Sequence, residues 1–345
     1  MSKIIHIGDN NEFIPPFIEF IKDNFDFQKH HFHLRSGMAE VVNYTNVSVY
    51  EHTVLKGLKY YILALIKMHR ADKIILHGLF DIKLVFFLAL TPWLLKKCYW
   101  VMWGGDLYQY KFGKKNKYWW CGEFFRRRVI KNIANLVTYI KGDVELARRW
   151  YQAQGVHVEC LMYPSNIFKD YQLEKKVSEV TTILVGNSAD PSNNHSEILH
   201  KLIEFKDRNI KVITPLSYGN QAYAKQVITE GKKLLGNRYQ ALTKFVPFEK
   251  YLEILAQVDV AVFNHKRQQA MGNTITLLGL GKKVYIRSEV SQWKLFKNLG
   301  IVVHDVEKLN KTLFSDTKKN NKNNNTKVKE YFSKENYLSQ LKVFL

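Results

Sequence analysis

Two segments of the sequence combine glycine, amide and hydroxyl side chains in a way that suits a diphosphate. One follows the apolar run Thr182–Gly186, and the other precedes a helical pattern over Thr274–Leu280. Glycine lets backbone N–H groups approach an anion, and asparagine and serine add donors, although ordinary capped loops between a strand and a helix have the same composition. The residues that we expect to contact a nucleoside diphosphate and its substituents are Gly186, Asn187, Ser188, Tyr218, Arg267, Gln268, Gln269, Gly272, Asn273 and Thr274.

The second of these segments suggests how a departing diphosphate would be stabilised. Arg267 supplies positive charge, with His265 and Lys266 beside it, and Asn273 or Thr274 could cap a helix whose N-terminus attracts anions. The two glutamines after Arg267 could hydrogen-bond ribose or sugar hydroxyl groups. The chain contains neither a P-loop nor a dinucleotide-binding glycine pattern, and no Asp-x-Asp pair that would hold a divalent cation. We therefore predict a metal-independent site that uses no cofactor.

Three residues at the ends of predicted strands could act as a general base. Asp106 follows Gly104 and Gly105, which would present its carboxylate at the carboxyl end of an apolar strand. A carboxylate in a partly dry site can have a raised pKa and accept a proton, although Asp is also common as a turn or capping residue. His77 and Asp9 end two other predicted strands and are the alternatives to Asp106.

Short apolar runs alternate with longer helical patterns, which is typical of parallel sheets with crossover helices. In the first half, strands are predicted at Lys3–Ile7, Lys73–His77, Tyr99–Trp103 and Leu136–Ile140, with a helix-rich entry over Asn24–Val49 between the first two. In the second half, they are predicted at Thr182–Gly186, Lys211–Thr214, Val258–Phe263, Lys283–Ile286 and Ile301–His304. Ligands of such sheets gather at the carboxyl ends of the strands, where the candidate residues lie.

The length of 345 residues is sufficient for two hydrophobic cores. We predict an α/β fold of two Rossmann-like domains that face a central cleft. The N-terminal acceptor domain would comprise residues 1–165 and the donor domain residues 181–306, joined by a hinge-like linker over 166–180. Residues 307–345 are predicted to form an exposed Lys/Asn-rich connection, over Lys308–Lys329, and a last helix, over about Val328–Phe344.

The charge of the chain calls for an anionic partner. Lys and Arg number 52 against 31 Asp and Glu, a formal net charge of +21, although a lysine-rich composition can also reflect codon usage. Such a surface attracts nucleic acids, anionic membranes or phosphorylated substrates. The N-terminus has no signal-peptide pattern, and the longest apolar stretch, Leu79–Leu95, is shorter than the ~20 residues that a membrane-spanning helix needs.

Aromatic and basic residues interleave over residues 108–131. This mixture suits a membrane surface, where aromatic rings lie at headgroup depth and cations contact phosphates. It would also suit single-stranded nucleic acid, or a helix that buries its rings in the core. No nucleic-acid-binding motif accompanies the segment, so we predict an anionic membrane surface as the partner and no nucleic acid.

Three sequences in the chain resemble one family of enzymes. Trp103–Tyr108, Ile183–Asp190 with the following Asn194-His195, and Arg267–Gly272 resemble bacterial 4-acetamido-4,6-dideoxygalactose (Fuc4NAc) transferases of glycosyltransferase family 56, which act in enterobacterial common antigen synthesis. The segment Phe245–Tyr251 is similar as well. The resemblance implies a GT-B fold and inverting transfer from a dTDP-sugar to a polyprenyl-diphosphate-linked glycan. It also implies a peripheral enzyme at the cytoplasmic face of the bacterial inner membrane.

Other functions fit parts of the same pattern. A related O-antigen or capsule glycosyltransferase that uses a UDP- or GDP-sugar would have a very similar sequence. A non-catalytic membrane- or polyanion-binding protein, or an enzyme acting on RNA, would explain the charge. Neither of these last two would explain the paired diphosphate-type loops, so we expect a glycosyltransferase.

Overall fold

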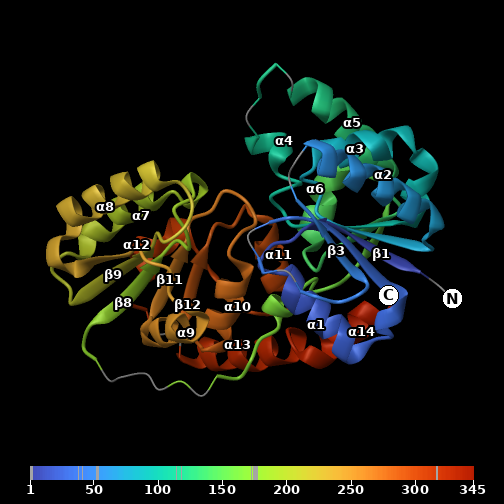
Figure 1. Cartoon of the computed structure of the whole chain (residues 1–345). Coiled ribbons are helices and arrows are strands. Elements are labelled where there is room, and N and C mark those ends of the chain that lie inside the picture. Colours follow the sequence, from blue (N-terminus) through green and yellow to red (C-terminus); the bar gives the residue numbers. More distant parts are fainter. Residues whose placement is uncertain are drawn as a thin grey trace. The chain divides into compact units, whose positions relative to one another are not determined.

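The computed structural model describes residues 3–37, 39–40, 42–51, 54–113, 115–117, 119–171, 173, 178–315 and 318–345. The chain forms two compact units (Figure 1). Unit 1 comprises Met1–Ile167 and Lys334–Leu345, and unit 2 comprises Phe168–Ser333. The sequence predicted a change of domain within 166–180, and the structure divides the units at the start of that range. It also returns the last helix of the chain to unit 1.

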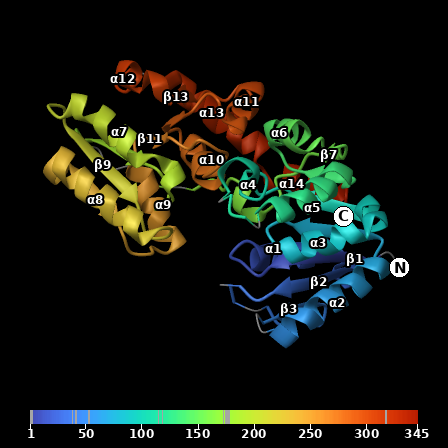
Figure 2. The same cartoon turned by 90° about the horizontal axis from the view of Figure 1, so that it is seen from above.

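Unit 1 is built on a seven-stranded parallel sheet of order β3-β2-β1-β4-β5-β6-β7. Its strands β3, β2 and β1 lie side by side in Figure 2. Its strands are β1 Ile4–Asp9, β2 His30–Arg35, β3 Val47–Tyr50, β4 Lys73–His77, β5 Cys98–Val101, β6 Asn135–Val137 and β7 Val156–Val158. The order reverses at β1 and β4, which are neighbours in the sheet although distant in the sequence. Such a switch point is where the loops after two strands diverge and leave room for a ligand.

Helices cover both faces of the sheet of unit 1 (Figure 1). They are α1 Ile14–Asn24, α2 Val54–Arg70, α3 Ile82–Leu90, α4 Gln109–Phe112, α5 Trp119–Asn132, α6 Lys141–Tyr151 and α14 Lys334–Lys342. The larger core packs α2, α3, α5 and α6 against apolar side chains of the strands. On the other face, Phe17 of α1 contacts the rings of His6 and His77. In the described part of the chain, no helix combines the length and apolar character needed to cross a bilayer.

Unit 2 has a six-stranded parallel sheet of order β10-β9-β8-β11-β12-β13. Its strands are β8 Thr181–Val185, β9 Ile210–Pro215, β10 Tyr239–Leu242, β11 Val260–Phe263, β12 Lys283–Ile286 and β13 His304–Asp305. Its helices are α7 His195–Leu202, α8 Gln221–Leu235, α9 Phe248–Gln257, α10 Met271–Gly279, α11 Ser291–Asn298, α12 Leu309–Thr312 and α13 Lys318–Tyr331. Here the switch point lies between β8 and β11, so the loops that follow these two strands are neighbours.

The structure corrects two regions of the prediction. The entry over Asn24–Val49, predicted as rich in helix, contains β2 and most of β3. The sequence did not indicate β2 because its histidines interrupt the apolar pattern, although His30 and His33 are buried in the structure. The prediction of an exposed loop for the Lys/Asn-rich region is wrong, since this region contains the helix α12 and most of α13. Val328 and Asn324 anchor α13: Val328 is buried, and the Asn324 amide bonds both the N–H and the carbonyl of Val302.

Candidate functional site

The two diphosphate-type loops of unit 2 are joined by a buried asparagine. Oδ1 of Asn193 accepts hydrogen bonds from the backbone N–H of Asn187, at 2.9 Å, and from Nε2 of His265, at 2.8 Å. Asn193 is fully buried, so this oxygen holds the loop after β8 and the loop after β11 in one fixed arrangement. Burial lowers the pKa of His265 to about 3, so its ring is neutral and donates here through Nε2. No pattern in the sequence indicated that Asn193 links the two loops.

Three of the predicted site residues meet at the surface of these loops. Gln269 accepts a hydrogen bond from the Ser192 hydroxyl at 2.9 Å and donates to the Asn187 side chain at 3.3 Å. Arg267 forms an ion pair with Asp190 at 3.4 Å. Burial alone would raise the pKa of Asp190, but hydrogen bonds from Ser192 and the charge of Arg267 outweigh it and lower that pKa. The loops therefore keep a guanidinium and two amide side chains together in a partly exposed position.

Helix α10 begins earlier than the sequence predicted. Its first residue is Met271, and the residue before it, Ala270, has the left-handed backbone conformation with φ 60°. Neither Asn273 nor Thr274 caps the helix, which corrects the prediction, because Thr274 is buried and its hydroxyl donates to the Ala270 carbonyl. The first turn contains Gly272, and its backbone N–H groups have no acceptor within the helix. A strained residue at this point is typical of a functional loop.

A pocket of about 220 Å³ opens beside the two loops in unit 2. Four aromatic side chains line it, and Phe245 is the most exposed of them at 83%. Asn187 donates from its amide to the Tyr218 hydroxyl, and Asn273 donates to the Tyr251 hydroxyl, so both asparagines hold rings of the wall. The lining residues are Asn187, Pro215, Ser217, Tyr218, Leu242, Lys244, Phe245, Val246, Phe248, Tyr251 and Asn273.

Besides Thr274, three other predicted contact residues are withdrawn from solvent and do not line the pocket. Ser188 and Gln268 are buried, and Gly186 is buried with φ 70°. A Cβ atom at position 186 would lie 2.3 Å from Nε2 of His195. Gly186 is therefore required by the close approach of the His195 ring and by its own backbone conformation. These residues shape the loop, whereas Asn187, Tyr218 and Asn273 line the pocket.

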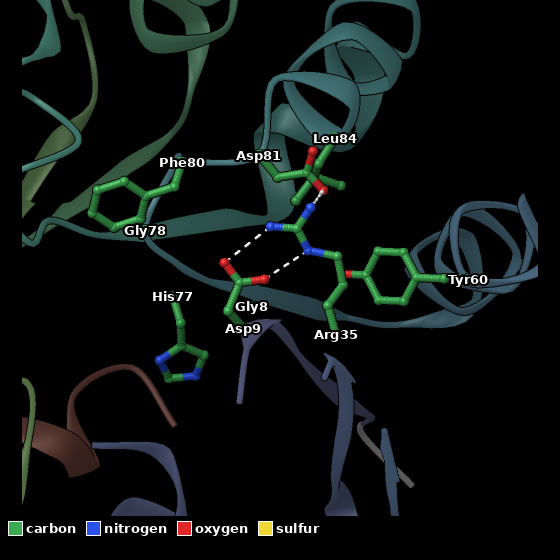
Figure 3. Close-up of a pocket in the computed structure, with 9 residues that line it drawn as sticks. All are labelled: Gly8, Asp9, Arg35, Tyr60, His77, Gly78, Phe80, Asp81 and Leu84. Atoms are coloured by element: carbon green, nitrogen blue, oxygen red, sulfur yellow. Dashed lines mark hydrogen bonds and ion pairs between the residues drawn. The ribbon is translucent and has the colours of Figure 1, made fainter. Parts of the chain in front are cut away.

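A second, smaller pocket lies at the switch point of unit 1, where Asp9 ends β1 and His77 ends β4 (Figure 3). Arg35 binds both oxygens of Asp9, at 2.6 and 2.9 Å, and its remaining nitrogen binds Asp81 at 2.9 Å. Burial would lower the pKa of Arg35, but the two carboxylates raise it, so the guanidinium stays charged. The side chain of Asp9 is 37% exposed and that of Asp81 is 10% exposed. Asp9 therefore offers the more accessible carboxylate of this pocket.

Asp106 has a different environment from the one that the sequence suggested. Its carboxylate is fully buried and is surrounded by four donors. Oδ2 accepts from Trp100 Nε1 at 2.7 Å and from Leu79 N at 3.0 Å, and Oδ1 accepts from Leu107 N at 2.9 Å and Trp103 N at 3.1 Å. Burial raises the pKa of Asp106, and these bonds oppose the rise. The prediction of a carboxylate presented to a cleft is wrong, because its oxygens hold the loop together.

We expect Asp106→Asn to destabilise unit 1 by about 3 kcal/mol, because an amide NH₂ would face donors and leave buried N–H groups unpaired. Urea unfolding followed by tryptophan fluorescence measures this, since six of the seven tryptophans belong to unit 1. Asp23→Asn, on the exposed surface of α1, is the control and should change stability by less than about 0.5 kcal/mol. Unchanged stability with lost turnover would restore Asp106 as a catalytic candidate.

Both ring nitrogens of His77 are engaged. Nδ1 lies 2.7 Å from the hydroxyl of Tyr163, and Nε2 lies 3.1 Å from Nδ1 of His6. Burial lowers the pKa of His77 to about 3. His77 thus lines the small pocket as a neutral ring with no free nitrogen, and Asp9 remains the predicted base whose position allows contact with an acceptor.

Solved structures show the same architecture at low sequence identity. HepE of Anabaena, solved with UDP and glucose, has a TM-score of 0.67 and 13% identity over 99% of both chains. Sucrose-phosphate synthase of Thermosynechococcus elongatus has a TM-score of 0.70 and 11% identity over 99% of this chain and 98% of that one. WaaG, a glycosyltransferase of lipopolysaccharide biosynthesis, has a TM-score of 0.62 and 12% identity over the same shares. The predicted GT-B fold of two Rossmann-like domains is confirmed.

One family accounts for nearly the whole chain. Residues 2–345 match the family described as 4-alpha-L-fucosyltransferase, glycosyl transferase group 56. The match includes both pockets and both loops, and it rules out the non-catalytic binding protein as an explanation of the sequence. The chain is a glycosyltransferase and belongs to the 4-alpha-L-fucosyltransferase family, glycosyltransferase group 56.

Proposed function

We propose that the chain transfers Fuc4NAc from its dTDP-linked donor to a polyprenyl-diphosphate-linked glycan, with inversion and without a metal ion. The family name describes transfer of fucose, and Fuc4NAc has the same 6-deoxygalactose skeleton. Two of the three sequence motifs that resemble Fuc4NAc transferases, Ile183–Asp190 and Arg267–Gly272, include the loops that build the site in unit 2, and the third, Trp103–Tyr108, lies in unit 1. A lipid-linked acceptor places the reaction at a membrane surface, as a peripheral enzyme of the bacterial inner membrane in surface polysaccharide synthesis.

The observation that carries the donor assignment is the aromatic pocket beside the two joined loops of unit 2. A nucleobase stacks on aromatic rings because its faces are apolar and polarizable. Tyr218 and Phe245 offer exposed rings in a space of about 220 Å³, and Lys244 adds a positive charge at the same wall. We assign the base and ribose of the donor to this pocket.

The diphosphate is assigned to the surface between Asn187 and the first turn of α10. Arg267 supplies the fixed charge there, and the free N–H groups of the helix N-terminus supply oriented donors. In the described ranges, no three His, Cys, Asp or Glu side chains are grouped so that they could hold a metal ion. The groups that the described loops do offer are the cation and the helix N-terminus, which stabilise negative charge as it develops on the leaving diphosphate.

Acceptor activation is assigned to Asp9 of unit 1. In an inverting transfer, the acceptor hydroxyl attacks the anomeric carbon, its proton passes to a base, and the bond to the diphosphate breaks. Asp9 lies at the carboxyl end of β1 in the small pocket and is accessible, whereas the atoms of His77 and Asp106 are occupied. Arg35 fixes the carboxylate in one orientation, which favours proton transfer in a defined direction.

The donor proposal is tested by titration calorimetry with dTDP, UDP, GDP and ADP, each with magnesium and with EDTA. We expect dTDP to bind most tightly and equally well in EDTA. Phe245→Ala should weaken dTDP binding about tenfold, because an exposed stacking ring is lost. Phe314→Ala removes another exposed ring of unit 2, outside the pocket, and should leave binding unchanged.

Each other result of this titration has a definite meaning. Preference for UDP or GDP would favour a related O-antigen or capsule glycosyltransferase over the Fuc4NAc transferase. Loss of binding in EDTA would contradict metal independence. Equal effects of Phe245→Ala and Phe314→Ala would remove the aromatic pocket of unit 2 as the base site.

A further inference from the structure

Helix α3 of unit 1 exposes a continuous apolar stripe. Ile82, Phe86 and Leu90 are spaced by four residues, so they lie one above the other along a single face of the helix. All three are exposed, as is Trp93 in the short helical segment that follows, Pro92–Lys97. The opposite face of α3, with Leu84, Val85 and Leu88, is buried in the core of unit 1. The outward stripe is therefore additional to the apolar surface that α3 needs for folding.

Helix α5 extends this surface. It packs against α3, where Gly122 leaves room for the Ile82 side chain and the ring of Phe125 meets that of Phe86 at 4.9 Å. Trp120 and Phe124, one turn apart, are 68% and 65% exposed. The α3–α5 face, as we define it, consists of Ile82, Phe86, Leu90, Trp93, Trp120 and Phe124, whose exposure ranges from 39% to 68%.

The charges around the α3–α5 face have one sign. Between residues 82 and 97 the charged side chains are Lys83, Lys96 and Lys97, and α5 adds Arg127, Arg128 and Lys131, whereas its Arg126 is buried. The single acidic residue of these segments, Glu123, is buried. Two exposed aromatics at the start of α5 are thus followed, along the same helix, by exposed Arg127 and Arg128. Packing of the core does not require exposed aromatic rings, and an ordinary solvated helix usually has exposed carboxylates as well as cations.

We infer that the α3–α5 face docks unit 1 onto an anionic lipid bilayer. Its aromatic and aliphatic side chains would enter the headgroup region, while the exposed Lys and Arg side chains around it contact lipid phosphates. The functional role of this docking rests on the proposed lipid-linked acceptor. The attraction of the α3–α5 face to an anionic bilayer does not depend on that proposal. The sequence predicted a membrane-contacting segment over 108–131, and the structure limits the proposed contact within it to residues of α5. It adds residues of α3, a helix for which the sequence predicted no membrane contact. Tyr118 and Lys114 of that segment lie outside the described residues.

The test measures binding of the full chain to sedimented vesicles of phosphatidylcholine alone or with about one third phosphatidylglycerol. We expect binding to the anionic vesicles that weakens as salt rises, and little binding to the neutral ones. Trp120→Ser/Phe124→Ser should reduce the partition coefficient about tenfold or more. Val156→Ser/Val343→Ser is the matched control, because both valines are exposed on unit 1 outside the α3–α5 face. Arg128→Glu should weaken binding much more than Lys232→Glu, an equal charge change on unit 2.

Four outcomes would overturn the inference. They are failure of the chain to bind anionic vesicles, equal loss in the two double variants, tighter binding to a single-stranded oligonucleotide, and self-association that only Trp120→Ser/Phe124→Ser abolishes. The vesicles contain no glycan acceptor, and dTDP binding is measured separately in solution. Failure of docking would therefore leave donor binding intact, whereas failure of the proposed function would appear as absent nucleotide binding.

Discussion

Asp9→Asn should reduce kcat by about a thousandfold, the middle of the range for loss of a general base. The asparagine has nearly the same shape and can still accept a hydrogen bond from Arg35, but it cannot take the proton of the acceptor hydroxyl. We assign donor binding to unit 2, so the Kd for dTDP should stay within about twofold. The measurement is release of dTDP in the presence of a polyprenyl-diphosphate-linked glycan, with calorimetry on the same variant.

Asp81→Asn is the matched control for this variant. Asp81 binds the same guanidinium as Asp9, but its oxygens are also used by the hydroxyl of Tyr61 and the backbone N–H of Lys83. It should therefore cost activity about tenfold at most, through poorer orientation of Arg35. Equal losses in the two variants would show that the shared ion pair matters and that Asp9 is not the base. Unchanged turnover in Asp9→Asn would remove it from the mechanism.

The diphosphate-type loops could be predicted from the sequence because their signal is local. Small and amide residues directly after an apolar run are visible without knowing the fold, and parallel strands then bring their ends to one edge. Arg267, Gln269 and Asn187 were found in this way, and the structure brings them together. Tyr218 was predicted as a contact residue, but the aromatic pocket could not be derived in this way, since Tyr218 and Phe245 follow different strands, β9 and β10. Their convergence depends on sheet order.

The same reasoning fails for residues whose role depends on burial. Asp106 follows two glycines at a strand end, as a presented catalytic carboxylate would. The sequence could not show that Trp100 and three backbone N–H groups turn toward it and enclose it. The strand β2 was missed for a related reason, because His30 and His33 read as polar residues but pack inside the unit. These two histidines can be buried because they have hydrogen-bond partners elsewhere in the sequence, His6 for His30 and the Tyr60 carbonyl for His33.

The histidines of unit 1 form a buried chain of hydrogen bonds that ends at an aromatic pair. Trp103 Nε1 can only donate, and it donates to the Tyr163 hydroxyl at 2.9 Å. Tyr163 can then donate to His77, His77 to His6 at 3.1 Å, and His6 to His30 at 2.9 Å. In this direction every link has one donor and one acceptor, all three rings are neutral, and the Tyr163 hydrogen is also used. Protonating a histidine would turn its accepting nitrogen into a second donor, so the links would have to rearrange inside the core.

Unit 1 should lose stability in mild acid because these histidines must stay neutral. Burial lowers the pKa of His30 to about 4 and that of His77 to about 3, and it lowers that of His6 well below its ordinary value of 6.5. A lowered pKa in the folded state gives stability that is complete above pH 6.5 and is lost as the pH falls toward 4. At pH 5 each buried histidine should cost up to about 2 kcal/mol relative to neutral pH.

We therefore expect the unfolding free energy of unit 1, followed by tryptophan fluorescence in urea, to fall by several kcal/mol between pH 7 and pH 5. His30→Gln should make this fall smaller by about 2 kcal/mol, because the amide oxygen can still accept from His6 but does not bind a proton. His69→Gln, which removes a solvent-exposed histidine of the same unit, should leave the fall unchanged. A stability that stays constant over this range would mean that the buried chain accepts protons without cost. In that case the hydrogen-bonded histidines could carry a proton away from the pocket that Asp9 and His77 line. The arrangement of neutral rings derived from Trp103 would then be wrong.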